Sequence, residues 1–185
     1  RRADMEIYEG TLVKLDPIDP ENDSASIAAW TRDGAYARLE DANLAVIYPE
    51  NATREYIENQ LKNSYYFTIL TRKECKMIGF IELDGFNWPA REVWVGIGIG
   101  DREFQGRGYG TDAMRLALRF AFLELNLNRV SLTVFEYNQR GIRSYEKAGF
   151  EAEGREREAL ERDGKRWDML FMGILREDWE KLPEK

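Results

Sequence analysis

The chain has 185 residues, of which 43% are hydrophobic and 33% charged, and this balance fits one domain with a sizeable core. The net charge of −7 argues against a broad nucleic-acid-binding face, and no apolar run is long enough to span a membrane. One cysteine and no histidine exclude an internal disulfide, an imidazole base and a thiolate–imidazole metal cluster. We therefore expect a cytoplasmic protein, a monomer or homodimer, without nucleic-acid or membrane partners.

Hydrophobic periodicity and turn residues predict an α/β chain in which strands and short helices alternate. In chain order we expect a strand at 6–15, helices at 19–33 and 51–63, strands at 65–71, 76–86 and 91–100, a helix at 110–125, a strand at 129–135, a helix at 138–149 and strands at 151–161 and 165–175. These elements predict one mostly antiparallel sheet with helices on both faces, in a single domain over 1–185. Residues 1–4 precede Met5, a candidate natural start, and we expect them to be an addition or unordered.

Short local signals define several ends of these elements. Asn51 or Thr53 is expected to cap the helix that follows, and Gly149 to end the helix at 138–149. A polar turn around Lys73 should join two strands, and the dipeptide beginning at Asp163 should close a hairpin. The charged run from 151 to 166 then fits the solvated face of that hairpin, or the rim of a substrate cleft.

Three glycines alternate in the stretch "QGRGYG", at Gly106, Gly108 and Gly110, between a predicted strand and a predicted helix. Glycine permits tight turns and allows another group to approach the backbone closely. Successive backbone N–H groups in such a turn, together with the positive end of the following helix, form a site for an anion such as pyrophosphate. The same stretch also fits a turn that binds nothing.

Three kinds of phosphate-binding loop compete for this stretch. The nucleotide-hydrolase loop requires a lysine before its last residue, but Thr111 follows Gly110 directly. The dinucleotide loop lacks its third glycine here, and the surrounding strands do not suit a parallel sheet. The third pattern, Gln/Arg-x-x-Gly-x-Gly/Ala, is matched by Gln105, Gly108 and Gly110.

With this loop the chain resembles the GNAT superfamily of N-acetyltransferases. A second motif supports the resemblance, because "NQRGIRSYEKAGF" is similar to the family's Asn-x-x-(Ala/Gly)-x-x-x-Tyr-x-x-x-Gly-Phe. The matching residues are Asn138, Gly141, Tyr145, Gly149 and Phe150. The resemblance covers 10–179, is sharpest over 96–150, and favours the RimJ/RimL-like branch of ribosomal-protein N-terminal and spermidine acetyltransferases. It implies a splayed mixed sheet and acetyl-coenzyme A as cosubstrate, with no metal.

The resemblance also implies roles for individual residues. In the family the glycine loop holds the pyrophosphate of the cofactor, the asparagine hydrogen-bonds its pantetheine arm, and the tyrosine is the general acid for the leaving thiolate. Asn138 also suits a helix cap, and Tyr145 shares a helix face with Ile142, so both residues fit structural roles too. The expected cofactor-binding residues are Ile97, Gly98, Ile99, Gln105, Gly106, Arg107, Gly108, Tyr109, Gly110, Thr111, Asn138, Tyr145 and Lys147.

The strand at 91–100 should present two different faces, with isoleucine and valine on one and glycines, Glu92 and Trp94 on the other. In the family this strand parts from the next one, the pantetheine arm pairs with its edge, and a backbone N–H near 97–99 stabilises the oxyanion. Related enzymes often carry a glutamate near the position of Trp94, so this chain departs from the pattern. Glu92 or Glu82, acting through a water, is the candidate general base; both also fit as solvated strand carboxylates.

The sequence therefore predicts an acetyl-coenzyme A-dependent N-acetyltransferase that acts by direct transfer in a ternary complex. The resemblance also implies that the two N-terminal helices wall the acceptor side, where aromatic residues Trp30 and Tyr36 lie beside several acids. Those acids are Asp19, Glu21, Asp23, Glu40 and Asp41. Carboxylates beside aromatic residues suit any cationic amine. The resemblance to the RimJ/RimL-like branch makes a peptide N-terminal amine the first choice of acceptor, with a polyamine second and an aminoglycoside-type amine third. The alternative from another class is a non-catalytic acetyl-coenzyme A sensor.

Overall fold

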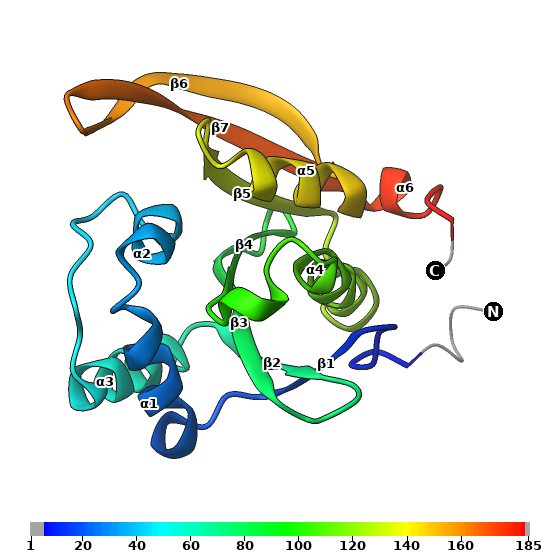
Figure 1. The fold of residues 1–185 in the computed structure, drawn as a ribbon. Helices are drawn as coiled ribbons and strands as arrows, with labels where there is room; N and C mark the ends of the chain where they lie inside the picture. The colour runs from blue at the N-terminus through cyan, green and yellow to red at the C-terminus, as the bar shows by residue number, and fades with distance from the viewer. Residues whose placement is uncertain (1–5, 184–185) are drawn as a thin grey trace.

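The computed structural model describes residues 6–183, which contain one seven-stranded sheet in the order β1-β2-β3-β4-β5-β7-β6 (Figure 1). The strands are β1 (Val13–Pro17), β2 (Tyr65–Thr71), β3 (Met77–Asn87), β4 (Glu92–Ile99), β5 (Arg129–Phe135), β6 (Glu151–Arg162) and β7 (Lys165–Leu175). The helical segments are α1 (Pro20–Trp30), α2 (Gly34–Glu40), α3 (Glu50–Gln60), η2 (Arg102–Phe104), α4 (Tyr109–Arg119), η3 (Phe120–Glu124), α5 (Gln139–Ala148) and α6 (Arg176–Trp179). The expectation for residues 1–4 lies outside the described residues.

The sheet is mixed and mostly antiparallel, as the sequence predicts. β4 and β5 form a parallel pair, whereas each of the other neighbouring pairs is antiparallel. A parallel pair requires a crossover, and α4 with the π-helical turn η3 supplies it. The parallel pair is therefore the place where the two antiparallel halves of the sheet join.

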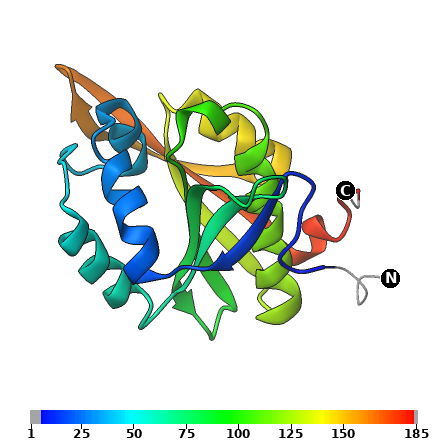
Figure 2. The same cartoon turned by 60° about the horizontal axis from the view of Figure 1, so that its bottom comes forward.

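Helices cover both faces of the sheet, which confirms the predicted layers (Figure 2). On one face, α4 packs on the strands through a buried stripe that includes Met114, Leu118 and Phe122 of η3, and α5 lies beside it. On the other face, α1 and α3 pack together over a smaller cluster centred on Ile57 and Tyr66. The alternating side chains of β4 divide between these two layers, with Val93 buried in the larger core.

Two predictions about where elements end are confirmed, one at the end of α5 and one at the β6–β7 turn. Gly149 is the C-cap of α5 with a φ of 106°, a left-handed conformation that favours glycine. Asp163 and Gly164 both have positive φ and close the β6–β7 hairpin. The turn between β2 and β3 contains Lys73, as expected.

The N-terminal part differs from the prediction in three places. The strand expected from residue 6 begins only at Val13, because the chain reverses tightly through Gly10, whose N–H donates to the Val13 carbonyl. The helix at 51–63 begins one residue earlier, and its N-cap is Pro49; the hydroxyl of Thr53 instead donates to the Pro49 carbonyl. α2 was not predicted as a separate helix, although Asp33 caps it with its side chain.

The helix expected over 110–125 changes its winding before it ends. Residues 120–124 form a π-helical turn, and the N–H of Leu125 donates to the carbonyl of Phe120 at 3.1 Å. The uninterrupted run of apolar residues here satisfies both windings, so the sequence pattern did not distinguish them. The last short helix, α6, was not predicted either.

Candidate active site

The sheet opens between β4 and β5, because these parallel strands pair only near their starts. Their register joins residues 92–94 to residues 129–131. β4 continues to Ile99 while its other edge stays paired with β3, so residues 95–99 of β4 have no strand partner on the side of β5. Such an edge offers backbone N–H and C=O groups to an extended ligand. The predicted splay of the sheet is therefore present.

The glycine-rich loop leads the chain from the end of β4 into α4. Gly106 and Gly108 have φ angles of 70° and 90°, in the left-handed region that favours glycine. Gly108 is the N-cap of α4, and no side chain caps this helix, so the first N–H groups of α4 are available to an anion. A Cβ on Gly110 would meet Ile99 and Ser144 only at ordinary contact distances of 3.5 and 3.8 Å. Alanine therefore fits at position 110, as the motif allows.

A hollow of about 660 Å³ lies beside this loop, and we call it the loop-side hollow. Its wall carries four cationic side chains, which are Arg115, Arg140, Arg143 and Lys147. Asp112 also lines this wall, but its carboxylate is engaged within the protein: it accepts hydrogen bonds from the backbone N–H groups of Leu12 and Val13 at 2.7 and 3.0 Å. A helix N-terminus among cations attracts a polyanion, although the whole chain carries a net charge of −7.

Most of the predicted cofactor-binding residues line the loop-side hollow. They are Ile97, Ile99, Gln105, Gly106, Gly108, Gly110, Thr111, Asn138, Tyr145 and Lys147. The side chain of Gln105 fixes the loop, because its amide donates to the carbonyl of Ile99 at 2.7 Å and accepts from Arg140 at 2.9 Å. The loop is thus tied both to β4 and to α5.

Three predicted residues are not part of this wall. The guanidinium of Arg107 donates back to the carbonyl of Glu103 at 3.0 Å, and the ring of Tyr109 packs edge-on against Phe104. Gly98 faces the opposite side of β4, toward α2. For these residues only the backbone remains available to a ligand in the loop-side hollow.

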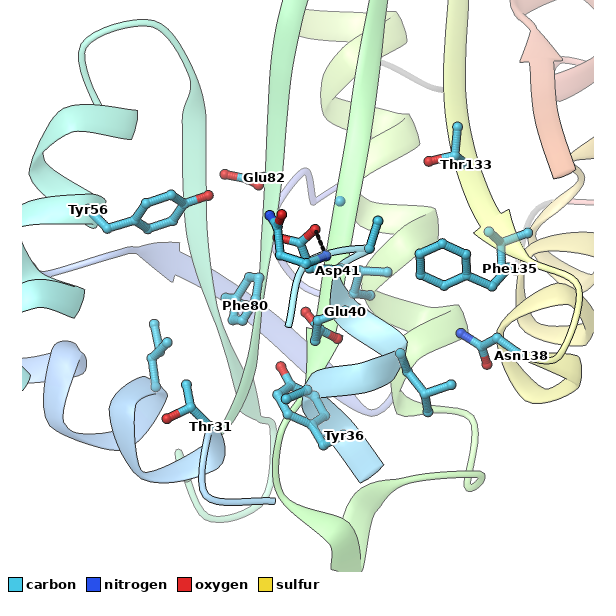
Figure 3. Close-up of a pocket in the computed structure, with 18 of the residues that line it drawn as sticks. Thr31, Tyr36, Glu40, Asp41, Tyr56, Phe80, Glu82, Thr133, Phe135 and Asn138 are labelled. Atoms are coloured by element: carbon cyan, nitrogen blue, oxygen red, sulfur yellow. Dashed lines mark hydrogen bonds between the residues drawn. The ribbon is translucent and has the colours of Figure 1, made fainter. Parts of the chain in front are cut away.

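A second hollow of about 680 Å³ lies on the opposite side of β4, toward α2 and α3, and we call it the helix-side hollow (Figure 3). The two hollows share six lining residues, which are Tyr36, Leu39, Glu40, Ile97, Asn138 and Tyr145. These residues come from α2, β4 and the start and middle of α5. They mark a junction through which a ligand in one hollow can contact a ligand in the other.

Asn138 and Tyr145 each make a structural contact, and each also lines both hollows. The Oδ1 atom of Asn138 accepts the N–H of Gly141 at 2.9 Å and caps α5, which leaves the donor end of the amide for another partner. The ring of Tyr145 packs edge-on against Phe150. Burial raises the pKa of the Tyr145 phenol well above its ordinary value, and the Glu40 carboxylate raises it further, so this hydroxyl stays protonated near neutral pH.

The helix-side hollow is acidic and aromatic. Its carboxylates are Glu40, Asp41, Glu82 and Asp84, and the described residues of its wall include no lysine or arginine. Its aromatic residues are Tyr36, Tyr48, Tyr56, Tyr66, Phe80, Trp94 and Phe135. Figure 3 shows the hydroxyl of Tyr56 directed toward the Glu82 carboxylate. The two hollows therefore have opposite charge, cationic beside the glycine loop and anionic beside α2.

Glu82 is a buried strand carboxylate whose pKa is raised. It lies in β3 directly opposite Gly96 of β4, and its Oε2 atom is buried without a hydrogen-bond partner among the described residues. Burial, together with the neighbouring Asp84, raises the pKa of Glu82 to about 7. A carboxyl group with this pKa can exchange protons near neutral pH.

Glu40 and Tyr36 bring α2 close to the backbone of β4. A methyl group at Gly98 would overlap the Tyr36 hydroxyl and come within 2.7 Å of the Glu40 carboxylate, so a larger residue there would displace these two side chains. The surrounding protein raises the pKa of Glu40, with burial as the main cause and Glu82 as a further one. Water in the open hollow still reaches the Glu40 side chain. A ligand that displaces this water strengthens the shift.

Glu92, the other candidate base, lies away from both hollows. It belongs to the paired start of β4, where its carboxylate accepts the Ser131 hydroxyl at 2.8 Å and pairs with Arg129 at 3.3 Å. It lines neither hollow. Trp94, in contrast, lines the helix-side hollow and lies opposite Asp84 across the β3–β4 pair. Of the two candidate bases, Glu82 therefore lines the helix-side hollow and Glu92 does not.

Several acidic residues of the N-terminal helices have structural contacts instead. Asp19 caps α1, and the hydroxyl of Thr68 donates to Asp23 at 2.8 Å. Glu21 pairs with Arg54 at 3.5 Å. None of these three acids lines either hollow.

The sequence prediction missed two residues of the helix-side hollow that a local signal could have identified. Asp84 follows Glu82 by two positions on the same strand, and period-2 alternation places both on one face. Tyr56 falls one helical turn after Ala52 on α3, and both line the hollow. Within the described residues, no cluster of three or more potential ligands is arranged to hold a metal ion. No helix there is both long and apolar enough to cross a membrane.

Comparison with known proteins adds an independent finding. The sequence model of one protein family, the acetyltransferase (GNAT) domain, matches residues 13–151 of this chain. An uncharacterized N-acetyltransferase from the SPbeta prophage of Bacillus subtilis (strain 168), YokL, is 31% identical over 131 residues, which cover 70% of this chain and 73% of that protein. The putative ribosomal N-acetyltransferase YdaF of the same bacterium is 35% identical over 106 residues, 57% of this chain and 56% of the relative.

Solved structures share the same architecture. The spermidine N-acetyltransferase from Vibrio cholerae, solved in complex with CoA and spermine, superposes with a TM-score of 0.81 and covers 91% of this chain and 98% of its own. Its sequence is 22% identical, so this likeness concerns the fold. The overall fold described above therefore recurs in a structure that contains CoA.

Proposed function

Because the chain belongs to the GNAT acetyltransferase family, we propose that it transfers an acetyl group directly to a primary amine and that a peptide N-terminus is its preferred acceptor. The chain is an N-acetyltransferase with acetyl-coenzyme A as its cosubstrate. The nature of the acceptor and the roles of individual residues are parts of the proposal.

The single observation that carries the cofactor assignment is the coincidence of an unpaired strand edge with an uncapped helix N-terminus. The pyrophosphate would bind the N–H groups of residues 106–111, and the cationic wall of the loop-side hollow would balance its charge. The pantetheine arm would pair with residues 97–99 of β4, and the amide of Asn138 would donate to it. The terminal thioester would then reach the junction of the two hollows.

Bound acetyl-coenzyme A supplies an acetyl group already activated as a thioester. At the junction, the protonated hydroxyl of Tyr145 would donate its proton to the departing sulfur. Backbone N–H groups near Ile97 on the open edge of β4 would stabilise negative charge on the acyl oxygen. Glu82, with its raised pKa, would accept the proton of the attacking amine through a water.

The charge of the helix-side hollow supports an acceptor that is cationic and carries no anionic group beside its amine. Carboxylates without a neighbouring lysine or arginine repel the free carboxylate of an amino acid. In a peptide N-terminus this carboxylate is replaced by an uncharged amide. The rim of the hollow also contains the exposed apolar residues Leu44, Val46 and Tyr48, which suit the first side chains of a peptide.

A polyamine is the second candidate, because several carboxylates in one hollow can also hold several ammonium groups. Relatives and neighbours named for ribosomal and for spermidine acetylation both occur, so the family alone leaves the acceptor open. An aminoglycoside-type amine comes third. A non-catalytic acetyl-coenzyme A sensor is the alternative from another class. The oligomeric state and the cytoplasmic location stay predictions.

A thiol-release assay with acetyl-coenzyme A and a panel of amines tests the proposal. The panel should contain peptides with varied first residues, the same peptides with blocked N-termini, spermidine, an aminoglycoside, and one amino acid as its free acid and as its amide. We expect turnover with unblocked peptides, little with blocked ones, and faster turnover of the amide than of the free acid. Rapid turnover of spermidine without any peptide acetylation would establish the second candidate, and no turnover with any amine would favour the sensor.

A further inference from the structure

Arg162 is the last residue of β6, and its side chain contacts the C-terminal end of α2, which lies far from it in sequence. Its guanidinium donates to three backbone carbonyls there, those of Arg38, Asp41 at 2.6 Å and Asn43 at 3.0 Å. A guanidinium presents five N–H donors in a fixed plane, which suits several acceptors at once. The ring of Phe135 lies 5.7 Å from the guanidinium carbon and supports its orientation.

Of the three carbonyls that Arg162 binds, that of Arg38 belongs to the last turn of α2, whereas those of Asp41 and Asn43 belong to the segment that follows the helix. The last carbonyls of an α-helix have no partner within the helix, and the same end carries a partial negative charge. α2 has only seven residues, so its own hydrogen bonds hold it weakly. At its other end, the cap residue Asp33 is paired with Arg102 of η2. Each end of α2 is therefore tied by an arginine from a distant element.

The segment that follows α2 depends on the same contact. Residues 41–48 form no regular secondary structure, and most of their side chains are exposed. Among the described residues, their long-range hydrogen bonds are those from Arg162 at the start and the one from the Tyr48 N–H to the Thr31 hydroxyl at the end. Around the same helix end, the Tyr137 hydroxyl donates to the carbonyl of Arg38 at 2.7 Å.

Tyr36 and Glu40, which α2 carries, are two of the six residues where the hollows meet, whereas Arg162 itself lines neither hollow. We propose that Arg162 is a positioning residue: it fixes α2 and the segment 41–48 over β4 and so sets the affinity for the acceptor amine. This inference rests on the proposed function, which places the acceptor in the helix-side hollow. It predicts that the acceptor site, and not the cofactor site, loosens when Arg162 is replaced.

The test compares Arg162→Gln and Arg162→Lys with the control Arg166→Gln. Arg166 lies on the same hairpin, but it pairs with Glu158 and Glu161 of the neighbouring strand. Steady-state kinetics give KM for the best amine of the panel and KM for acetyl-coenzyme A. Hydrogen exchange followed by mass spectrometry gives the protection of residues 34–48, and this measurement needs no acceptor.

We expect Arg162→Gln to raise KM for the amine on the order of tenfold or more, because small displacements of a substrate-binding wall are costly. KM for acetyl-coenzyme A should change by less than about twofold, and exchange should become faster over residues 34–48 but not in β4 or α5. The lysine variant should recover part of the acceptor affinity, and the control should match the wild type. Unchanged exchange over residues 34–48, or equal rises in both KM values, would overturn the proposal. If the wild type acetylates no amine, the proposed function fails, and the exchange result alone decides the role of Arg162.

Discussion

Glu82 and Gly96 lie directly opposite each other in the β3–β4 pair, so a buried carboxylate faces a residue without a side chain. A Cβ at Gly96 would lie 3.4 Å from Oε1 of Glu82, and the empty space lets this carboxylate face the helix-side hollow. Gly96 belongs to the part of β4 that has no partner on the side of β5, next to residues 97–99, where the pantetheine arm is proposed to pair. This relationship distinguishes Glu82 from the other strand carboxylates.

The first prediction compares the two candidate bases. Glu82→Gln keeps the shape of the side chain but cannot accept a proton, so kcat should fall by roughly 10²-fold. Glu92→Gln is the matched control, because Glu92 is engaged by Ser131 and Arg129 outside both hollows. Its kcat should stay within about twofold of the wild type. The reverse order of the two kcat values would assign the base to Glu92.

The second prediction concerns pH. Since the pKa of Glu82 is raised to about 7, this carboxyl is protonated and inactive as a base at lower pH, and it becomes active as the pH rises through that value. The other titratable groups that line the hollow are Glu40, Asp41, Asp84, Tyr36, Tyr48, Tyr56, Tyr66 and Tyr145. The profile of kcat/KM should therefore rise with pH around 7 in the wild type.

The acceptor amine also loses its proton as the pH rises, so the comparison with Glu82→Gln is essential. The amine contributes equally to both proteins, and only the part due to Glu82 disappears in the variant. Superimposable normalised profiles of the two proteins would show that Glu82 does not limit the reaction.

The third prediction concerns Tyr145. Tyr145→Phe retains the ring and its packing against Phe150 but removes the hydroxyl at the junction. If this hydroxyl protonates the leaving thiolate, turnover should fall by roughly 10²-fold while the affinity for acetyl-coenzyme A stays close to that of the wild type. Stopped-flow thiol release measures the turnover and calorimetry the affinity. Equal turnover in the two proteins would leave Tyr145 with a packing role only.

The fourth prediction separates two glycines of the loop. Gly108→Val should abolish detectable binding of acetyl-coenzyme A, because a φ of 90° excludes a branched side chain and the helix start would have to move. Gly110→Ala is the control: a Cβ fits there, and its affinity should be nearly unchanged. Calorimetry on folded samples of both variants provides the measurement. Normal affinity of the valine variant would refute the anion site at this loop.

Local patterns were sufficient for the parts of the site that lie in one continuous segment. The glycine loop and Asn138 are close in sequence to the turns that they form, and the alternation in β4 correctly separated its two faces. Their physical requirements, a positive φ or a helix cap, act over a few residues. The residues needed to predict these turns and this cap are therefore all present in one short stretch of sequence.

The choice between Glu82 and Glu92 could not be made in this way. Both are strand carboxylates, and their difference depends on where β5 separates from β4 and which residue of β3 faces Gly96. Strand register and splay are set by contacts between distant segments. The separate helix α2 was missed for a related reason, because its end is stabilised by Arg162 from the far end of the chain.

A crystal structure of the protein with CoA is the most direct test of the central claim, that the two hollows meet where the acetyl group is transferred. We predict that the pyrophosphate accepts hydrogen bonds from backbone N–H groups of residues 106–111, that the pantetheine arm pairs with residues 97–99 of β4, and that the thiol lies beside the hydroxyl of Tyr145. A pyrophosphate bound away from the glycine loop, or a thiol remote from Tyr145 and from the helix-side hollow, would contradict the account.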